Sequence, residues 1–174
     1  EIYYPKGAKS RRDFQIRAQK ALHQRLPVVM SWFVDFNAMG DDGAFRLPPE
    51  KPGHQGGHMT VLEDYQINGV PGFGTLEAGV LVTDPAALTA ALDPAAKIEF
   101  FRVKNSWGTD LAPPDGKGDF RGYHDLYLPY LDGLITQCTE ANGDACGSKS
   151  SVYGMTSLVL PPATFQTDGA GVEG

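Results

Sequence analysis

Two spacings of apolar residues run along the chain, and the first of them predicts a helix. Over residues 10–26 the apolar side chains recur three or four positions apart, which places them on one face of an α-helix. These side chains are Phe14, Ala18, Ala21, Leu22 and Leu26. Ser10 followed by Asp13 resembles an N-capping pair. We therefore predict one amphipathic helix over residues 10–26.

The second spacing predicts strands. Residues 28–36 are rich in β-branched and aromatic side chains, and residues 58–67 alternate between apolar and polar positions. Further strands are predicted over residues 97–104, 123–131 and 152–160. A short helix is predicted over residues 85–96, a segment rich in alanine with a proline near its first turn.

Glycine and proline separate these segments and set the expected fold class. The 21 glycines and 13 prolines fall largely in blocks between the predicted strands, which favours short strands joined by long loops. We predict an α+β fold: a strongly bent antiparallel sheet or half-barrel with one covering helix and long loop insertions. One domain is expected over residues 1–174, with a core of about 10–163 and a tail at 164–174. The helix either covers part of the sheet or packs against something outside the chain.

Charge and composition argue against two classes of function. The chain has 15 Lys and Arg against 21 Asp and Glu, a net charge of -6, which does not favour nucleic-acid binding. It has no run of about 18 apolar residues, so no membrane span is predicted.

The histidines do not show the spacing of a metal site. His54 and His58 are four residues apart, as on a metal-binding helix, but the glycines around them are incompatible with a helix. His23 and His124 have no ligand-like neighbours in the sequence. We predict neither a metal nor a cofactor.

Two short motifs carry the candidate chemistry. They are Gly57-His58-Met59-Thr60-Val61 and Lys104-Asn105-Ser106-Trp107-Gly108. An imidazole that exchanges protons near neutral pH, together with a polar group that orients its ring, provides the second and third members of a Cys-His-Asn hydrolase. No cysteine precedes either motif, so the nucleophile is not found upstream of this pair.

The order of these motifs among the predicted strands resembles the C-terminal half of papain-like cysteine peptidases. The resemblance covers most of residues 10–163, and the Lys-Asn-Ser-Trp-Gly block is its most specific part. The weaker matches are Leu26-Pro27-Val28-Val29, Gly122-Tyr123, Tyr153-Gly154-Met155 and Leu160-Pro161-Pro162.

The resemblance implies a role for each matching residue. His58 would be the general base and imidazolium partner, and Asn105 would bond its far ring nitrogen and fix tautomer and ring plane. Trp107 would shield this hydrogen bond from water and so strengthen it. Ser31, Gly57 and Met59 would lie along the substrate cleft. The implied reaction is hydrolysis of a peptide bond through a thioester acyl-enzyme.

The resemblance does not extend to the nucleophile. The family's cysteine lies in an N-terminal helical half, after a glutamine-containing oxyanion loop, and no such stretch occurs here. We predict that the chain is one product of a processed precursor, or an excised fragment. Its Cys-bearing N-terminal half would pack against it and complete the site for a peptide or protein substrate. Two alternatives remain: a non-catalytic relative that acts as a binding or assembly module, and an unrelated β-rich domain with a coincidental motif.

The two cysteines allow two interpretations. Cys146 begins a Cys-Gly-Ser stretch faintly like the family's catalytic segment, but poor helix sequence follows it. Cys138 and Cys146 enclose seven residues, and a disulfide that closes this loop is the interpretation that the sequence favours. Such a disulfide implies an extracytoplasmic or secreted location.

Overall fold

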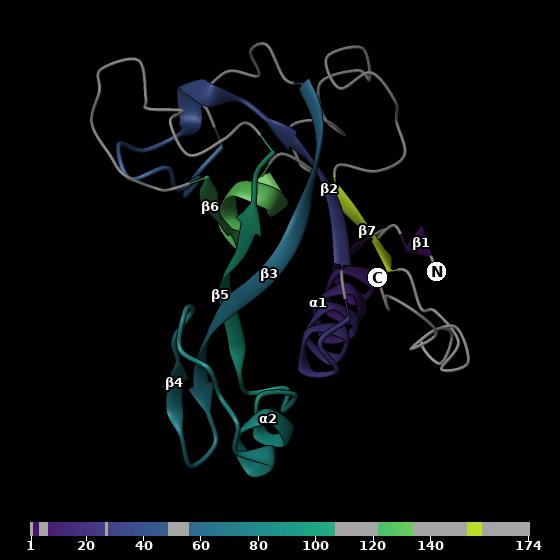
Figure 1. Cartoon of the computed structure of the whole chain (residues 1–174), viewed down its shortest axis with the longest axis vertical. Coiled ribbons are helices and arrows are strands. Elements are labelled where there is room, and N and C mark those ends of the chain that lie inside the picture. Colours follow the sequence, from purple (N-terminus) through teal and green to yellow (C-terminus); the bar gives the residue numbers. More distant parts are fainter. Residues whose placement is uncertain are drawn as a thin grey trace, which may run out of the picture.

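One antiparallel sheet organises the chain (Figure 1). The computed structural model describes residues 2–3, 7–26, 28–48, 56–106, 122–133 and 153–157. Within these ranges a seven-stranded sheet has the order β1-β7-β2-β3-β5-β6, with β4 paired to β3. The strands are β1 Ile2–Tyr3, β2 Val28–Val34, β3 Gly56–Val70, β4 Gly74–Leu76, β5 Lys97–Lys104, β6 Tyr123–Tyr127 and β7 Tyr153–Ser157. The named strands pair antiparallel, and an isolated bridge between Phe45 and Leu126 is parallel. The predicted α+β class with an antiparallel sheet is confirmed.

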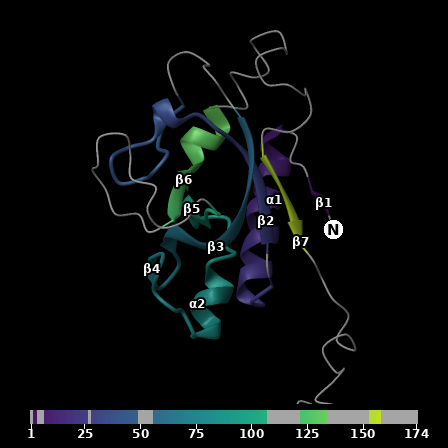
Figure 2. The same ribbon diagram turned by 45° about the horizontal axis from the view of Figure 1, so that its top comes forward.

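Helix α1, Gly7–His23, lies alongside β2 and β7 (Figure 2). Phe14 and Ala18 on its inner face are fully buried, and the Phe14 ring meets Phe101 of β5 edge-on at 5.8 Å. Burial of a phenylalanine side chain contributes about 1.5–3 kcal/mol. The helix therefore covers its own sheet, which resolves the alternative that the sequence left open.

The end of α1 differs from the prediction, which extended the helix to residue 26. The N–H of Leu26 donates to the carbonyl of Ala21 at 2.9 Å, and the N–H of Arg25 donates to that of Leu22 at 2.9 Å. These two bonds form a Schellman motif, which closes a helix through one left-handed residue. Arg25 is that residue, with φ of 56°. The chain thus leaves the helix three residues earlier than its apolar stripe indicates.

Strand β3 is longer than predicted and contains a β-bulge. Leu62 pairs with Val103 and Asp64 pairs with Arg102, so two steps along β3 match one step along β5. The extra residue shifts the alternation of buried side chains: Thr60 and Leu62 are buried before it, and the next buried position is Tyr65. A single period of two therefore does not describe the whole strand.

Residues 123–131 were predicted as one strand, and the second half of that prediction is wrong. β6 ends at Tyr127 and residues 128–133 are helical. Pro129 explains the change, because proline cannot donate to a strand ladder but is well tolerated in the first turn of a helix. Tyr130 and Leu131 of this turn are fully buried.

Two other predicted boundaries also move, and those of a third element lie outside the described residues. β2 ends at Val34, because the Asp35 side chain accepts from the N–H of Asn37 and begins the 3₁₀-helix η1, Phe36–Ala38. Helix α2 is Pro85–Ala90 rather than 85–96, since Pro94 is incompatible with a helix that continues through it. The predicted strand 152–160 appears as β7, and residues 158–160 and the predicted tail 164–174 lie outside the described ranges.

The core lies between α1 and the sheet and continues beneath β2 and β6. Its largest fully buried side chains include Trp32, Phe45, Phe101 and Tyr130. Trp32 meets Phe45 edge-on at 5.1 Å and Tyr130 at 6.4 Å. Among the described residues, no helix combines the length and apolar character needed to cross a bilayer.

The strained position at the end of α1 gives a stability prediction. We expect Arg25→Gly to raise the free energy of unfolding by about 0.5–1 kcal/mol, because glycine adopts positive φ without the steric cost of a side chain. Urea denaturation measures the change. Arg25→Ala is the matched control: it removes the same charge but keeps the Cβ. An Arg25→Gly variant no more stable than Arg25→Ala would contradict the prediction.

Candidate functional site

The structure brings His58 and Asn105 together. His58 lies near the start of β3 and Asn105 directly follows β5, and Val61 opposite Lys104 sets the register between them. The His58 Nε2 atom lies 3.1 Å from the Asn105 Oδ1 atom. The backbone N–H of Asn105 donates to the Gly122 carbonyl at 2.7 Å, which ties the residue to the start of β6. The two residues singled out by the motifs are therefore in hydrogen-bond contact.

A buried aromatic platform supports the His58 ring. Trp32 of β2 pairs with His58 in the sheet register, and the two rings meet edge-on at 5.9 Å. The indole N–H of Trp32 donates to the Thr60 hydroxyl at 3.0 Å, and Trp32 is only 2 % exposed. His58 itself is partly buried. One side of its ring is thus fixed by the core of the same chain.

A second histidine, His124 of β6, also belongs to this site. Its Nε2 atom lies 2.9 Å from Asn105 Nδ2, and its Nδ1 atom lies 2.9 Å from the Gly43 carbonyl oxygen. His124 is 2 % exposed. Burial lowers its pKa, and the nearby His58 acts in the same direction, whereas the Gly43 carbonyl and Asp125 act in the opposite one.

The sequence prediction gave His124 no role. Its alternation with the buried Leu126 signals that the side chain points inward. The residues that it contacts, Asn105 and Gly43, lie far from it along the chain, so no local motif predicted them.

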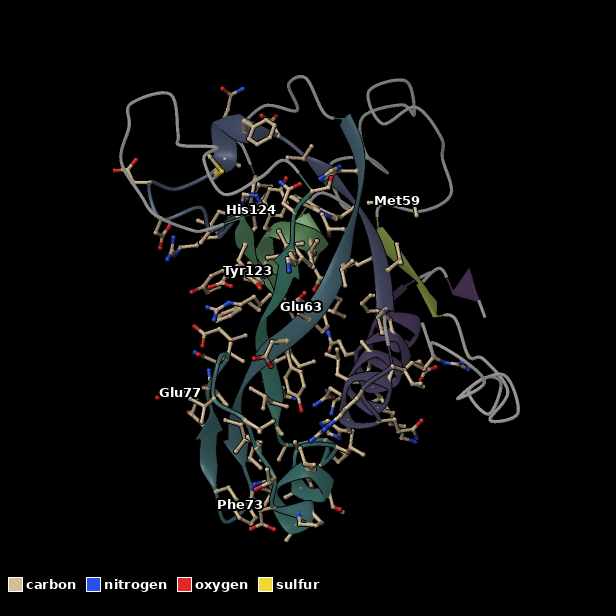
Figure 3. The ribbon with its side chains drawn as sticks, in the orientation of Figure 1. Met59, Glu63, Phe73, Glu77, Tyr123 and His124 are labelled. Atoms are coloured by element: carbon tan, nitrogen blue, oxygen red, sulfur yellow. The ribbon has the colours of Figure 1, made fainter. Side chains whose placement is uncertain are left out.

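Among the predicted cleft residues, Met59 lies on the other face of the sheet from His58. Met59 is 61 % exposed and its neighbour in alternation, Val61, is 40 % exposed, while Thr60 is buried. Position 31 of β2 pairs with Met59 of β3, and Gly57 lies two positions before Met59 along the same strand. Figure 3 shows Met59 and His124 toward the end of the sheet farthest from β4. The structure does not bring Met59 to the His58–Asn105 contact, and the cleft roles of Ser31, Gly57 and Met59 stay predictions.

Three other predicted site residues lie outside the described part of the chain. Trp107 follows the last described residue after β5, and the predicted disulfide between Cys138 and Cys146 falls within 134–152. The shielding role of Trp107 and the disulfide therefore stay predictions. Within the described ranges, no group of three or more His, Cys, Asp or Glu side chains is placed to hold a metal ion.

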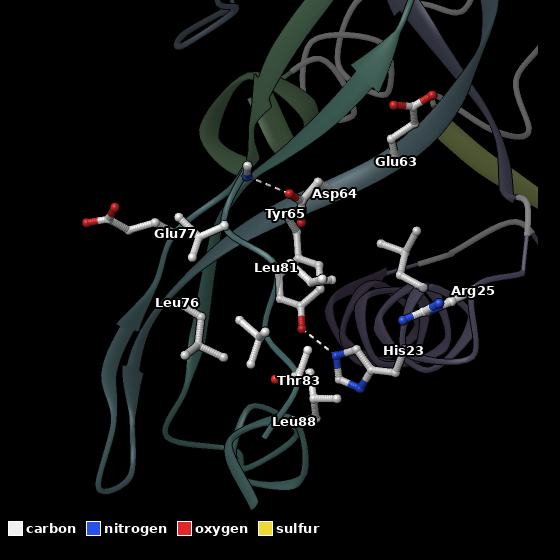
Figure 4. A pocket seen from close by; sticks show the side chains of 14 residues that line it. His23, Arg25, Glu63, Asp64, Tyr65, Leu76, Glu77, Leu81, Thr83 and Leu88 are labelled. Atoms are coloured by element: carbon white, nitrogen blue, oxygen red, sulfur yellow. Dashed lines mark hydrogen bonds between the residues drawn. The ribbon is translucent and has the colours of Figure 1, made fainter. Parts of the chain in front are cut away.

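A separate cavity lies between the end of α1, β3 and the loop at residues 77–83 (Figure 4). Its volume is about 450 Å³, and its lining includes His23, Tyr65 and Leu81 but neither His58 nor Asn105. The His23 ring nitrogen and the Tyr65 hydroxyl are 2.5 Å apart. Burial lowers the pKa of His23 and raises that of Tyr65. This cavity is distinct from the site at the start of β3.

Comparisons with models of protein families, with curated proteins and with solved structures found no match for this chain. A proposal for its function therefore rests on the motifs and on the geometry around His58.

The buried histidines predict a loss of stability in acid. Burial lowers the folded-state pKa of His124 and of His23, whereas in the unfolded chain each titrates near its ordinary value of about 6.5. As the pH falls below about 6.5, the unfolded chain binds protons that the folded chain does not, so the free energy of unfolding falls until the folded-state pKa is passed. Urea denaturation from about pH 7.5 down to about pH 5 measures this slope.

A variant without the two imidazoles provides the control. His23→Phe with His124→Phe should show a flatter dependence of unfolding free energy on pH over the same window. Asp42 does not interfere, because its pKa of about 2 in the folded chain, lowered by the hydrogen bond with Arg46, and its ordinary pKa of 3.8 both lie below this window. An unchanged slope in the double variant would show that other groups cause the acid sensitivity.

Proposed function

We propose that this chain is the His- and Asn-bearing half of a papain-like cysteine peptidase, and that a separate N-terminal half supplies the nucleophilic cysteine. The observation that carries the proposal is the 3.1 Å contact between His58 Nε2 and Asn105 Oδ1. The two residues are 47 positions apart, and the sequence motifs singled out both. A contact of this kind orients an imidazole for general base catalysis.

The contact assigns a function to each nitrogen of His58. With Oδ1 of Asn105 facing His58, the amide accepts the Nε2–H of His58, and the neutral ring then carries its lone pair on Nδ1. In the proposed reaction Nδ1 takes the proton of the partner's thiol, leaving a thiolate beside an imidazolium. The thiolate attacks the peptide carbonyl, and His58 returns the proton to the departing amine. Water then hydrolyses the thioester, with His58 as base, and releases the acid and the thiol.

Exposed apolar side chains support a partner at this end of the sheet. Met59 and Val61 lie on the outer face of β3 beside position 31, and both are more than a third exposed. Phe36, just after β2, is 46 % exposed, and Leu47 is 66 % exposed. Clusters of exposed apolar side chains are typical of surfaces that another polypeptide covers. Met59 and Val61 lie on the face opposite His58, whereas the Phe36 ring lies 6.4 Å from the ring of Phe45, which packs against Trp32 and His124. A Cys-bearing half that reaches His58 would therefore have to cover the side of the sheet that carries Phe36.

Peptidase assays test the role of the pair. We expect the 174-residue chain alone to be inactive towards peptides, and to gain activity when the Cys-bearing half is added. In that assembly His58→Ala should lower kcat by at least about 10²–10⁴-fold, the range for loss of a general acid–base group. Asn105→Ala should lower kcat by less and leave substrate binding unchanged, because the base remains but is no longer oriented.

Two controls make these outcomes decisive. His23→Ala replaces a histidine away from the pair and should leave turnover unchanged. Equal activity of wild type and His58→Ala in the assembly would contradict the assignment. Inhibitor-sensitive cleavage by the isolated chain would contradict the need for a partner, and its loss in Cys146→Ser would locate the nucleophile within this chain.

The coding sequence upstream of Glu1 separates the peptidase from a binding or assembly module. We expect it to encode a glutamine-containing loop followed by a helix that begins with cysteine, because the thiol must reach His58 from another segment. Sequencing of that region is the measurement. Alanine, serine or glycine at the cysteine position would instead favour the non-catalytic module.

A further inference from the structure

We infer that His124 is a positioning residue: it holds the Asn105 amide in one orientation and thereby selects the tautomer of His58. Its importance for turnover rests on the proposed function, whereas its effect on the His58 ring does not. The inference follows from a chain of four hydrogen-bonding groups: the Gly43 carbonyl, the His124 ring, the Asn105 amide and the His58 ring.

The first hydrogen bond determines which nitrogen of His124 carries the proton. A backbone carbonyl only accepts hydrogen bonds, so the His124 Nδ1 atom, 2.9 Å from the Gly43 oxygen, must carry a hydrogen. His124 is almost fully buried, and burial favours the neutral ring. A neutral ring protonated at Nδ1 carries its lone pair on Nε2.

The second hydrogen bond determines the orientation of the Asn105 side-chain amide. The Nε2 atom of His124 accepts a hydrogen bond from Asn105 Nδ2–H at 2.9 Å. If the amide were turned by 180°, its oxygen would face the lone pair of Nε2, and two buried acceptors would lie in contact without a proton between them. The buried surroundings of Asn105 offer little water to compensate. The nitrogen of the amide therefore faces His124 and its oxygen faces His58.

The third hydrogen bond determines which nitrogen of the His58 ring carries the proton. The Asn105 oxygen can only accept, so His58 donates through Nε2–H and carries its lone pair on Nδ1. This is the nitrogen that the proposed reaction uses as a base. Asn105 alone does not determine this outcome, because an amide presents a donor or an acceptor according to its orientation. His124 removes that choice.

The far end of this chain is anchored to the same sheet. Gly43 lies in a turn closed by the N–H of Gly40, which donates to the Ala44 carbonyl at 2.8 Å. Phe45 exchanges backbone hydrogen bonds with β6, from its N–H to Asp125 and from Tyr127 to its carbonyl. The Phe45 ring also packs edge-on against His124 at 5.6 Å. The Gly43 acceptor is therefore held in place beside β6.

Nitrogen NMR of the histidine rings in the 174-residue chain tests the inference without any peptidase activity. At mildly alkaline pH we expect wild-type His124 to be protonated at Nδ1 and wild-type His58 at Nε2. Either ring in the opposite tautomer would overturn the inference, whatever the variants show. His124→Phe keeps an aromatic ring against Phe45 but removes the acceptor, and His58 should then show a mixture of tautomers.

Two further variants distinguish positioning from a general effect on folding. His23→Phe alters another partly buried histidine and should leave the His58 tautomer unchanged. In an Asn105→Asp background both oxygens accept, so adding His124→Phe should leave His58 protonated at Nε2. The inference would be overturned if His58 kept its wild-type spectrum in His124→Phe. It would also be overturned if His124→Phe caused His58 to lose its single tautomer both with Asn105 and with Asp at position 105.

Kinetics with the Cys-bearing half then connect the tautomer to turnover. We expect His124→Phe to lower kcat with little change in KM, since it alters the orientation of the base rather than substrate contacts. If the tautomer of His58 changes but kcat does not, the importance of His124 for turnover is refuted, and its effect on the His58 ring stands. The absence of turnover in the wild-type assembly, with both tautomers as expected, would instead refute the peptidase proposal.

Discussion

The pairing of β3 with β5 is the constraint on which the candidate site depends. Val61 lies opposite Lys104, so His58 and Asn105 meet diagonally across the ladder. Side chains alternate between the faces of a strand, and a slip of one residue would turn His58 to the opposite face. Thr60, Leu62 and Val103 oppose that slip because all three are buried in the present register. The packing that stabilises the sheet therefore also fixes the distance between the two site residues.

Rigidity around this pair comes from aromatic packing rather than from charge. Trp32 contacts the His58 ring, and its own position is fixed by a hydrogen bond to Thr60 and by edge-on contacts with Phe45 and Tyr130. Large buried rings in a close-packed core have little freedom to move. Catalytic geometry requires such support, because small displacements of a base reduce its effectiveness. Helix 128–133 serves the site in this way by placing Tyr130 beneath Trp32.

The sequence predicted the main strands and α1, because their apolar periods directly reflect which face is buried. Prediction failed where local geometry overrides the period: at Pro129, which begins a helix, and at the bulge near Glu63, which shifts the alternation of β3. The pairing of His58 with Asn105 was predicted from motifs and is present as a contact. His124 received no role, because its partners are an amide distant in sequence and the carbonyl of Gly43. Every residue has a backbone carbonyl, so the residue types in the sequence do not indicate which carbonyl accepts this hydrogen bond.

An amide at position 105 suits the proposed site, in which the nucleophile would come from another polypeptide. Asn105 is almost fully buried, and its hydrogen-bond partners His124 and the Gly122 carbonyl are uncharged groups. A carboxylate there would be a buried charge until an imidazolium formed, and an unpaired buried charge costs several kcal/mol. An amide avoids this cost, so the His58–Asn105 contact forms before any thiolate is present. Oriented dipoles hold the pair, and its geometry is therefore independent of the partner that would complete the site.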